Sequence, residues 1–122
     1  MKFREYFQSA FETSETHNIP SLRTRYYRCR KEDAMNTLLK IAKSKKVYNF
    51  YKNEHFYEVS YETSGYIFYA KIVSTSVMET SVDIKVTTKT LFPFGKGKKI
   101  IEEYYSELDK LLPFKGVSLF RG

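Results

Sequence analysis

Four strand-like segments separated by breaks of two or three residues constrain the fold of this chain more than any other feature. Residues 47–51, 55–61, 66–73 and 80–90 are rich in β-branched and aromatic side chains, and the breaks fall at residues 52–54, 63–65 and 78–79. Connections this short join antiparallel strands, because a parallel return needs a crossover of about a dozen residues. The sequence therefore predicts an antiparallel meander over residues 47–90.

The last of these segments shows the clearest alternation of apolar and polar side chains. Its two sets are Val82, Ile84 and Val86 on one side, and Asp83, Lys85, Thr87 and Lys89 on the other. Successive side chains of a strand point to opposite faces of the sheet. One face of the predicted sheet is therefore covered and the other is in contact with water.

Two amphipathic helices flank the meander. The first begins near Glu32 and Asp33, which suit the positive end of a helix dipole, and it ends among lysines. Its apolar side chains recur with helical spacing: Met35, Leu38, Leu39 and Ala42. The second is predicted over residues 98–112 and stops at Pro113. Its apolar stripe consists of Ile101, Tyr104, Tyr105, Leu108 and Leu112.

A further strand, at residues 22–29, precedes the first helix, so the predicted order of elements is β-α-β-β-β-β-α. Both helices bury their apolar stripes if they cover the same face of the sheet. The expected fold class is α+β: a two-layer sandwich in which a meander of four to five antiparallel strands carries two helices on one face.

Residues 1–20 are interpreted as an N-terminal extension, and residues 21–122 as a single α+β domain. Phe3, Phe7 and Phe11 recur at i, i+4 and i+8, which predicts a short N-terminal helix, and Asn18-Ile19-Pro20 indicates a break. A chain of 122 residues has room for one hydrophobic core.

Composition favours a cytoplasmic protein that does not enter a membrane. The sequence contains no run of about 18 apolar residues, the length that a spanning helix needs. The first ten residues lack the uninterrupted apolar stretch of a secretory signal. Cys29 is the single cysteine, so an internal disulfide is excluded.

Short motifs near both ends of the chain form a pattern. They are Thr24-Arg25-Tyr26-Tyr27, Val82-Asp83-Ile84-Lys85-Val86-Thr87-Thr88, Phe94-Gly95, and Leu108-Asp109-Lys110-Leu111-Leu112 with Gly116. Together they resemble a group of small cytosolic proteins of Gram-positive bacteria to which no function is assigned. The resemblance implies a bacterial, cytosolic setting, and it carries over no activity and no site residues.

The formal net charge is +7, and two basic clusters could hold an anion or a nucleic acid. The first is an arginine-rich strand containing Arg23, Arg25 and Arg28, whose guanidinium groups can bind phosphate in bidentate fashion. The alternative is that these arginines form cross-strand ion pairs with glutamates: Glu54, Glu58 or Glu62.

The second cluster consists of Lys96, Lys98 and Lys99 in a glycine-containing loop that opens the second helix. Backbone N–H groups at such a position can hold an anion. The glycine spacing is not that of a P-loop, and Ile100 stands where a hydroxyl ligand for Mg²⁺ is required. The alternative is an exposed basic turn that Glu102 and Glu103 partly neutralise.

Nothing in the sequence indicates an enzyme, a metal site or a cofactor. The only histidines are His17 and His55, and neither they nor Cys29 lie in a nucleophile motif or show zinc-ligand spacing.

Aromatic side chains are in excess, with 11 Tyr and 10 Phe, and they crowd the first three strands of the meander. They cannot all face the helices, so we expect some to form an interface, with Tyr57, Tyr61 and Tyr69 as candidates.

The favoured function is a non-enzymatic interaction or self-association module, as a homodimer or with a protein partner. The alternatives are a nucleic-acid or phosphate-ligand binder that uses the basic clusters, and a binder of small apolar ligands between helices and sheet.

Overall fold

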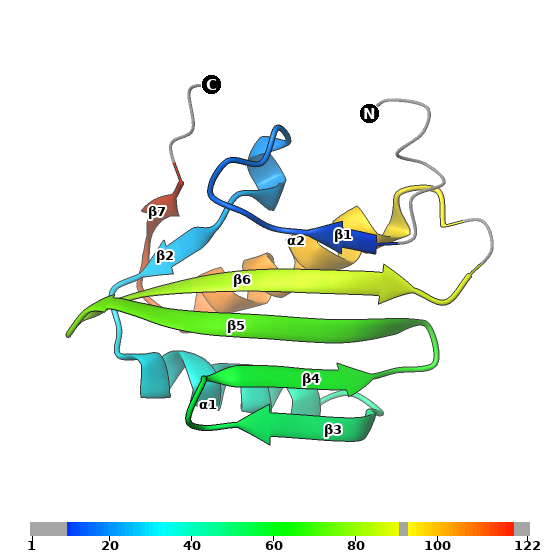
Figure 1. Cartoon of the computed structure of the whole chain (residues 1–122), viewed down its shortest axis with the longest axis horizontal. Coiled ribbons are helices and arrows are strands. Elements are labelled where there is room, and N and C mark those ends of the chain that lie inside the picture. The colour runs from blue at the N-terminus through cyan, green and yellow to red at the C-terminus, as the bar shows by residue number, and fades with distance from the viewer. Residues whose placement is uncertain (1–9, 91–92, 119–122) are drawn as a thin grey trace.

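The computed structural model describes residues 10–90 and 93–118, which form one antiparallel sheet with both helices behind it (Figure 1). The helices are α1 (Lys31–Lys43) and α2 (Lys96–Leu111), with a short 3-10 helix, η2 (Pro20–Leu22). The strands are β1 (Ala10–Glu12), β2 (Arg25–Tyr27), β3 (Tyr48–Asn53), β4 (Glu58–Glu62), β5 (Tyr66–Ser76), β6 (Glu79–Thr88) and β7 (Phe114–Val117). The expected α+β class is confirmed.

The described residues form seven strands rather than the expected four to five. The order across the sheet is β3-β4-β5-β6-β2-β7, and β1 also pairs with β6. The meander β3 to β6 is the predicted one, except that its first turn lies at residues 54–57 rather than 52–54. The strands β1 and β7 are not predicted, because each has only three or four residues and no alternation of its own. Long-range pairing with β6 and β2 makes them strands.

The predicted alternation in β6 is confirmed. Val82, Ile84 and Val86 are fully buried against the helices, whereas Lys85 is exposed on the opposite face. The core continues through the apolar stripes of the helices, which contribute Met35, Leu38, Ile101, Tyr105 and Leu108 among others. One face of the sheet is thus packed, and the other is largely open.

The second helix begins at Lys96, two residues before the predicted start. Gly95 has a φ of 77°, a left-handed conformation that glycine adopts without a steric penalty, and it turns the chain into the helix. Gly97 lies inside the first turn, where a Cβ would stand 3.0 Å from the Phe11 ring. The missing side chain therefore lets α2 approach β1 closely.

The N-terminal helix prediction is wrong where the structure can test it, and residues 1–9 lie outside the described residues. Phe11 belongs to β1, pairs with Val86 and is only 2% exposed. Pairing with β6 and burial under α2 outweigh the i, i+4 spacing. Residues 10–12 of the predicted extension are therefore part of the sheet and its core.

The predicted arginine-rich strand is shorter than expected. Of residues 22–29, only Arg25–Tyr27 are a strand, which lies between β6 and β7, and Leu22 ends η2. No helix in the described part of the chain has both the length and the apolar character that crossing a bilayer requires.

Candidate protein-interaction surface

One edge of the sheet is formed by β3, the lowest strand in Figure 1. It pairs with β4 on one side, and no strand among the described residues pairs with its other side. A bulge at Asn49, where φ is 52°, interrupts the pairing, which is regular again from Tyr51 to Asn53. The strand therefore presents unpaired backbone groups along its outer edge.

Large aromatic side chains are exposed around this edge. Tyr48, Phe50 and Tyr51 in β3 are 48%, 48% and 51% exposed, and Phe56 in the following turn is 60% exposed. We call these four residues the edge aromatics. Natural edge strands usually carry charge or are kept very short, which prevents association. This six-residue strand contains one charged residue, Lys52, and a bulge at Asn49, but it also combines an open edge with apolar surface.

Phe50 is the outer end of a row of stacked rings that crosses the sheet. Its ring centroid lies 6.3 Å from that of Tyr61 in β4, with an interplanar angle of 11°. Tyr61 stacks on Phe68 in β5 at 4.8 Å, and Phe68 stacks on Tyr104 in α2 at 4.3 Å. The row is buried at Tyr61, Phe68 and Tyr104 and half exposed at Phe50. The core thus reaches the surface at the β3 edge.

A groove of about 640 Å³ lies beside Phe50, between the end of α1 and β3. Its apolar lining consists of Leu39, Ala42, Val47 and Phe50, and its charged lining of Lys43, Lys45, Lys46 and Lys52. We call it the lysine groove. No acidic residue lines it. Among the described residues, Lys52 is paired with Glu54 at 2.9 Å, whereas Lys43 and Lys46 form no ion pair.

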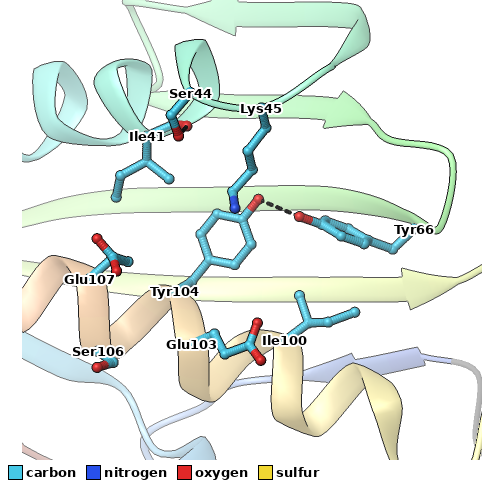
Figure 2. A pocket seen from close by; sticks show the side chains of 9 residues that line it. All are labelled: Ile41, Ser44, Lys45, Tyr66, Ile100, Glu103, Tyr104, Ser106 and Glu107. Carbon is cyan, nitrogen blue, oxygen red and sulfur yellow. Dashed lines mark hydrogen bonds between the residues drawn. The ribbon is translucent and has the colours of Figure 1, made fainter.

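A second cavity, of about 420 Å³, lies between α1 and α2 above the sheet (Figure 2). The Tyr104 hydroxyl lies 2.8 Å from the Tyr66 hydroxyl and is also hydrogen-bonded to Tyr61. Burial, with the hydrogen bonds from both neighbours, raises the pKa of Tyr104 far above its usual value. Lys45 reaches over the Tyr104 ring at 5.3 Å, and Glu103 and Glu107 face the cavity from α2 (Figure 2). The lining therefore mixes charges of both signs, unlike the apolar lining that the small-ligand alternative requires.

The three tyrosines predicted as interface residues have different surroundings. Tyr61 is 1% exposed and belongs to the ring row. Tyr57 is partly buried, with the Lys31 ammonium 4.6 Å from its ring centroid. Tyr69 lies in β5 on the open face of the sheet and donates a hydrogen bond to Glu58. Tyr51 and Phe56 are more exposed than any of these three tyrosines. No sequence signal distinguishes Tyr51 and Phe56, because side-chain exposure at an edge depends on the final strand order.

The predicted arginine site is divided between different surroundings. The Arg25 guanidinium packs against α2, 2.5 Å from the Asp109 carboxylate and 5.0 Å from the Tyr105 ring centroid. Arg23 donates from Nε to the His17 carbonyl at 2.9 Å, and Arg28 is exposed.

The glutamates suggested as partners of these arginines pair elsewhere. Their hairpin lies at the far end of the sheet from β2. Glu62 pairs with Lys89 at 2.9 Å, Glu54 pairs with Lys52, and Glu58 accepts the Tyr69 hydroxyl. Arg25 pairs instead with Asp109, because the last part of α2 brings this carboxylate within reach of the Arg25 side chain.

The predicted lysine site occupies the first turn of α2. Lys98 forms an ion pair with Glu102 at 2.9 Å, as the neutralised-turn interpretation expects. Burial opposes ionisation of Glu102, but the hydrogen bonds from Lys98 and Ser21 and the charges of Lys98 and Lys99 together outweigh it, so the pKa of this carboxyl is lowered. Lys96 and Lys99 are exposed.

The residues considered for catalysis do not gather into a site. Cys29 is buried, which raises the pKa of its thiol. The His17 Nδ1 atom accepts the Ile19 N–H at 3.0 Å, and the His55 ring packs on Phe56. Residues 10–90 and 93–118 contain no group of three or more side chains that could hold a metal ion.

Comparisons with protein-family models, curated proteins and solved structures found no match to this chain. The described residues define the protein by its architecture: a seven-stranded antiparallel sheet with two helices, an open edge at β3 and exposed aromatic side chains beside it.

Proposed function

We propose that this protein is a non-enzymatic interaction module that binds another polypeptide chain along the outer edge of β3. The observation that carries the proposal is the combination of an unpaired six-residue edge strand with half-exposed aromatic rings in that strand. An added strand would satisfy the outward backbone groups by hydrogen bonding, and its side chains would cover the edge aromatics.

The edge aromatics supply the energetic reason for binding. Burial of an aromatic side chain removes a large apolar area from water, at roughly 25 cal/mol per Å². Tyr51 and Phe56 in particular leave more than half of their surface exposed. Phe50 stacks on core-facing Tyr61, and its strand neighbour Tyr51 points to the opposite face, so aromatic surface is exposed on both faces of this edge.

The alternatives have weaker support. A nucleic-acid surface needs cations that are free to meet phosphates, and Arg25 and Lys98 already have carboxylate partners. The cavity between the helices is lined with opposite charges, which does not favour an apolar ligand. The edge strand is therefore the preferred site.

The test is a selection of random displayed dodecapeptides on the immobilised protein, in parallel with sedimentation velocity over a range of protein concentrations. The edge is blocked by Tyr51→Lys, which places a charge on exposed apolar surface without removing a buried side chain. The matched control is Ile67→Lys, which alters a 42% exposed apolar residue of β5. Circular dichroism verifies that both variants fold.

We expect either selected peptides or a concentration-dependent dimer, and in both cases the Tyr51→Lys variant loses the interaction while Ile67→Lys retains it. A protein that stays monomeric and selects no peptide would overturn the proposal. So would an interaction that is insensitive to Tyr51→Lys.

A further inference from the structure

The lysine groove lies where the side chains of an added strand would project. Val47, Phe50 and Lys52 line it from β3 and the residue before it, and Leu39, Ala42 and Lys43 line it from α1. Neighbouring strands lie about 4.8 Å apart, so a strand added at β3 places every second side chain over the groove. The residues that line the groove therefore determine which side chains of the added strand bind there favourably.

Within the described part of the chain, the charge of the groove is compensated by a neighbouring carboxylate only at Lys52. Four lysines line it and no carboxylate does. Lys45 lies over the Tyr104 ring, and only Lys52 has a carboxylate partner among the described residues. Bringing a carboxylate into the groove would gain Coulombic attraction to several ammonium groups at once, whereas another cation would be repelled.

The row of stacked rings indicates a second property of the added strand. It runs from Tyr104 through Phe68 and Tyr61 to Phe50, one ring for each successive element, and it stops at the sheet edge. The next strand outward would present its own ring to the exposed face of Phe50. Aromatic pairs of this kind are favoured beyond their buried area.

From these two features, and resting on the proposed function, we infer that the partner of β3 is an acidic extended peptide. An aromatic residue in it stacks on Phe50, and carboxylates two residues to either side face the lysine groove. Side chains on one face of a strand recur every second residue, so the motif reads acid-x-aromatic-x-acid.

A second copy of this chain fits the groove poorly. Residues 47–53 contain no acid, and Lys52 lies on the groove side of β3. Pairing two β3 strands would bring Lys52 and the lysine groove of one molecule towards those of the other, and like charges at close range oppose association. The groove thus favours a different, acidic chain.

The experiment uses displayed peptides with the pattern x-Z-x-Φ-x-Z-x, in which Φ is Phe, Tyr or Trp and Z is any residue. Selection on the wild-type protein should enrich Asp and Glu at both Z positions and deplete Lys and Arg. One selected peptide is then labelled, and its affinity is measured by fluorescence polarisation, together with a version in which both acids are replaced by lysine.

The protein variant is the double variant Lys43→Glu and Lys46→Glu. The charge-matched control carries Lys71→Glu and Lys85→Glu, in β5 and β6. All four lysines are exposed, so both proteins should fold. We expect the double variant to bind the acidic peptide about tenfold or more weakly, and the lysine-substituted peptide more tightly. Added salt should reduce the preference.

The outcomes separate this inference from the proposed function. Suppose that peptides lose binding to the Tyr51→Lys variant but show no preference for acidic residues. This result would overturn the inference of an acidic partner and would leave the proposed binding at the β3 edge intact. If no peptide depends on the edge and the protein does not self-associate, both proposals fail. Equal binding to the wild type and the double variant would also refute the charge argument.

Discussion

The Arg25 guanidinium lies 2.5 Å from the Asp109 carboxylate and so joins β2 to the last part of α2. The same carboxylate accepts the Tyr27 hydroxyl at 2.8 Å through its other oxygen. The guanidinium is held between the Tyr105 and Phe114 rings, 5.0 and 5.2 Å from their centroids. With side-chain exposures of 21% and 27%, the pair is only partly shielded from water. These contacts give Arg25 a structural role at the junction of β2, β7 and α2.

Replacing Asp109 should therefore lower the free energy of unfolding by more than the loss of a surface ion pair does. Asp109→Ala leaves the buried Tyr27 hydroxyl without its acceptor and Arg25 without its counter-charge, so the free energy of unfolding should fall by about 2 kcal/mol. Urea denaturation measures this loss. In the double variant with Arg25→Met part of the stability should return, because the uncompensated charge is gone. Strictly additive losses would refute the coupling between the two side chains.

Asp83 should make the fold less stable as the pH rises above the acidic range. Its Oδ1 atom accepts hydroxyl hydrogen bonds from Thr13 and Thr24, both at 2.7 Å, but burial outweighs them and raises the pKa of the carboxyl above its ordinary 3.8. The folded state therefore favours the protonated form. Stability from this group is present below pH 3.8 and is lost as the pH rises through the higher pKa of the folded state.

The matched variant is Asp83→Asn, whose side-chain oxygen can still accept both hydroxyl hydrogen bonds. We expect it to be more stable than the wild type at neutral pH and to lose that advantage towards pH 3.8. Chemical denaturation across this range gives the difference. Parallel stability curves for the two proteins would contradict the assignment.

Gly97 should resist substitution even though alanine is the better helix former. A Cβ at this position would lie 3.0 Å from the Phe11 ring, closer than ordinary contact, and Phe11 is buried under α2. We expect Gly97→Ala to lower the free energy of unfolding by about 1 kcal/mol, since overpacking outweighs the propensity gain. In a Phe11→Leu background the same substitution should become neutral or stabilising. Equal effects in both backgrounds would show that the ring is not the obstacle.

The buried tyrosines should make the fold sensitive to alkali. Burial raises the pKa values of Tyr27, Tyr61, Tyr104 and Tyr105 well above the ordinary 10.0. These groups contribute stability below pH 10.0, and that stability is lost as the pH rises and the unfolded chain ionises first. Phenolate absorbance and circular dichroism recorded together should show their ionisation only as the secondary structure disappears. Complete ionisation of the tyrosines in a native fold would contradict this.

The meander and both helices could be predicted because their signals are local. The alternation around Ile84 and the helical spacing around Leu38 and Leu108 each arise from one continuous segment packing against one core. The short strands β1 and β7 could not be predicted, because Phe11 and Phe114 lie in them through pairing with residues far away in the chain. At Phe11 the helical spacing favoured the wrong element.

The sequence indicated that the protein has an aromatic interface, but it did not indicate which residues form it. An excess of aromatic residues indicated an interface, yet Tyr61 is buried by the ring row while Phe50, in the next strand, is half exposed. That difference depends on which strand is last in the sheet. The surroundings of the basic residues also depend on the tertiary structure, since only the packing of α2 brings Asp109 to Arg25.

The sequence by itself determined the α+β class, the antiparallel hairpins and the face of β6 that is buried, because periodicity and short connections act between neighbouring residues. Only the tertiary structure decided that β3 is an edge, that a lysine groove opens beside it, and that the arginines of the β2 region have separate surroundings. Those features arise where segments distant in sequence meet. Their free energy comes from contacts that no local pattern encodes.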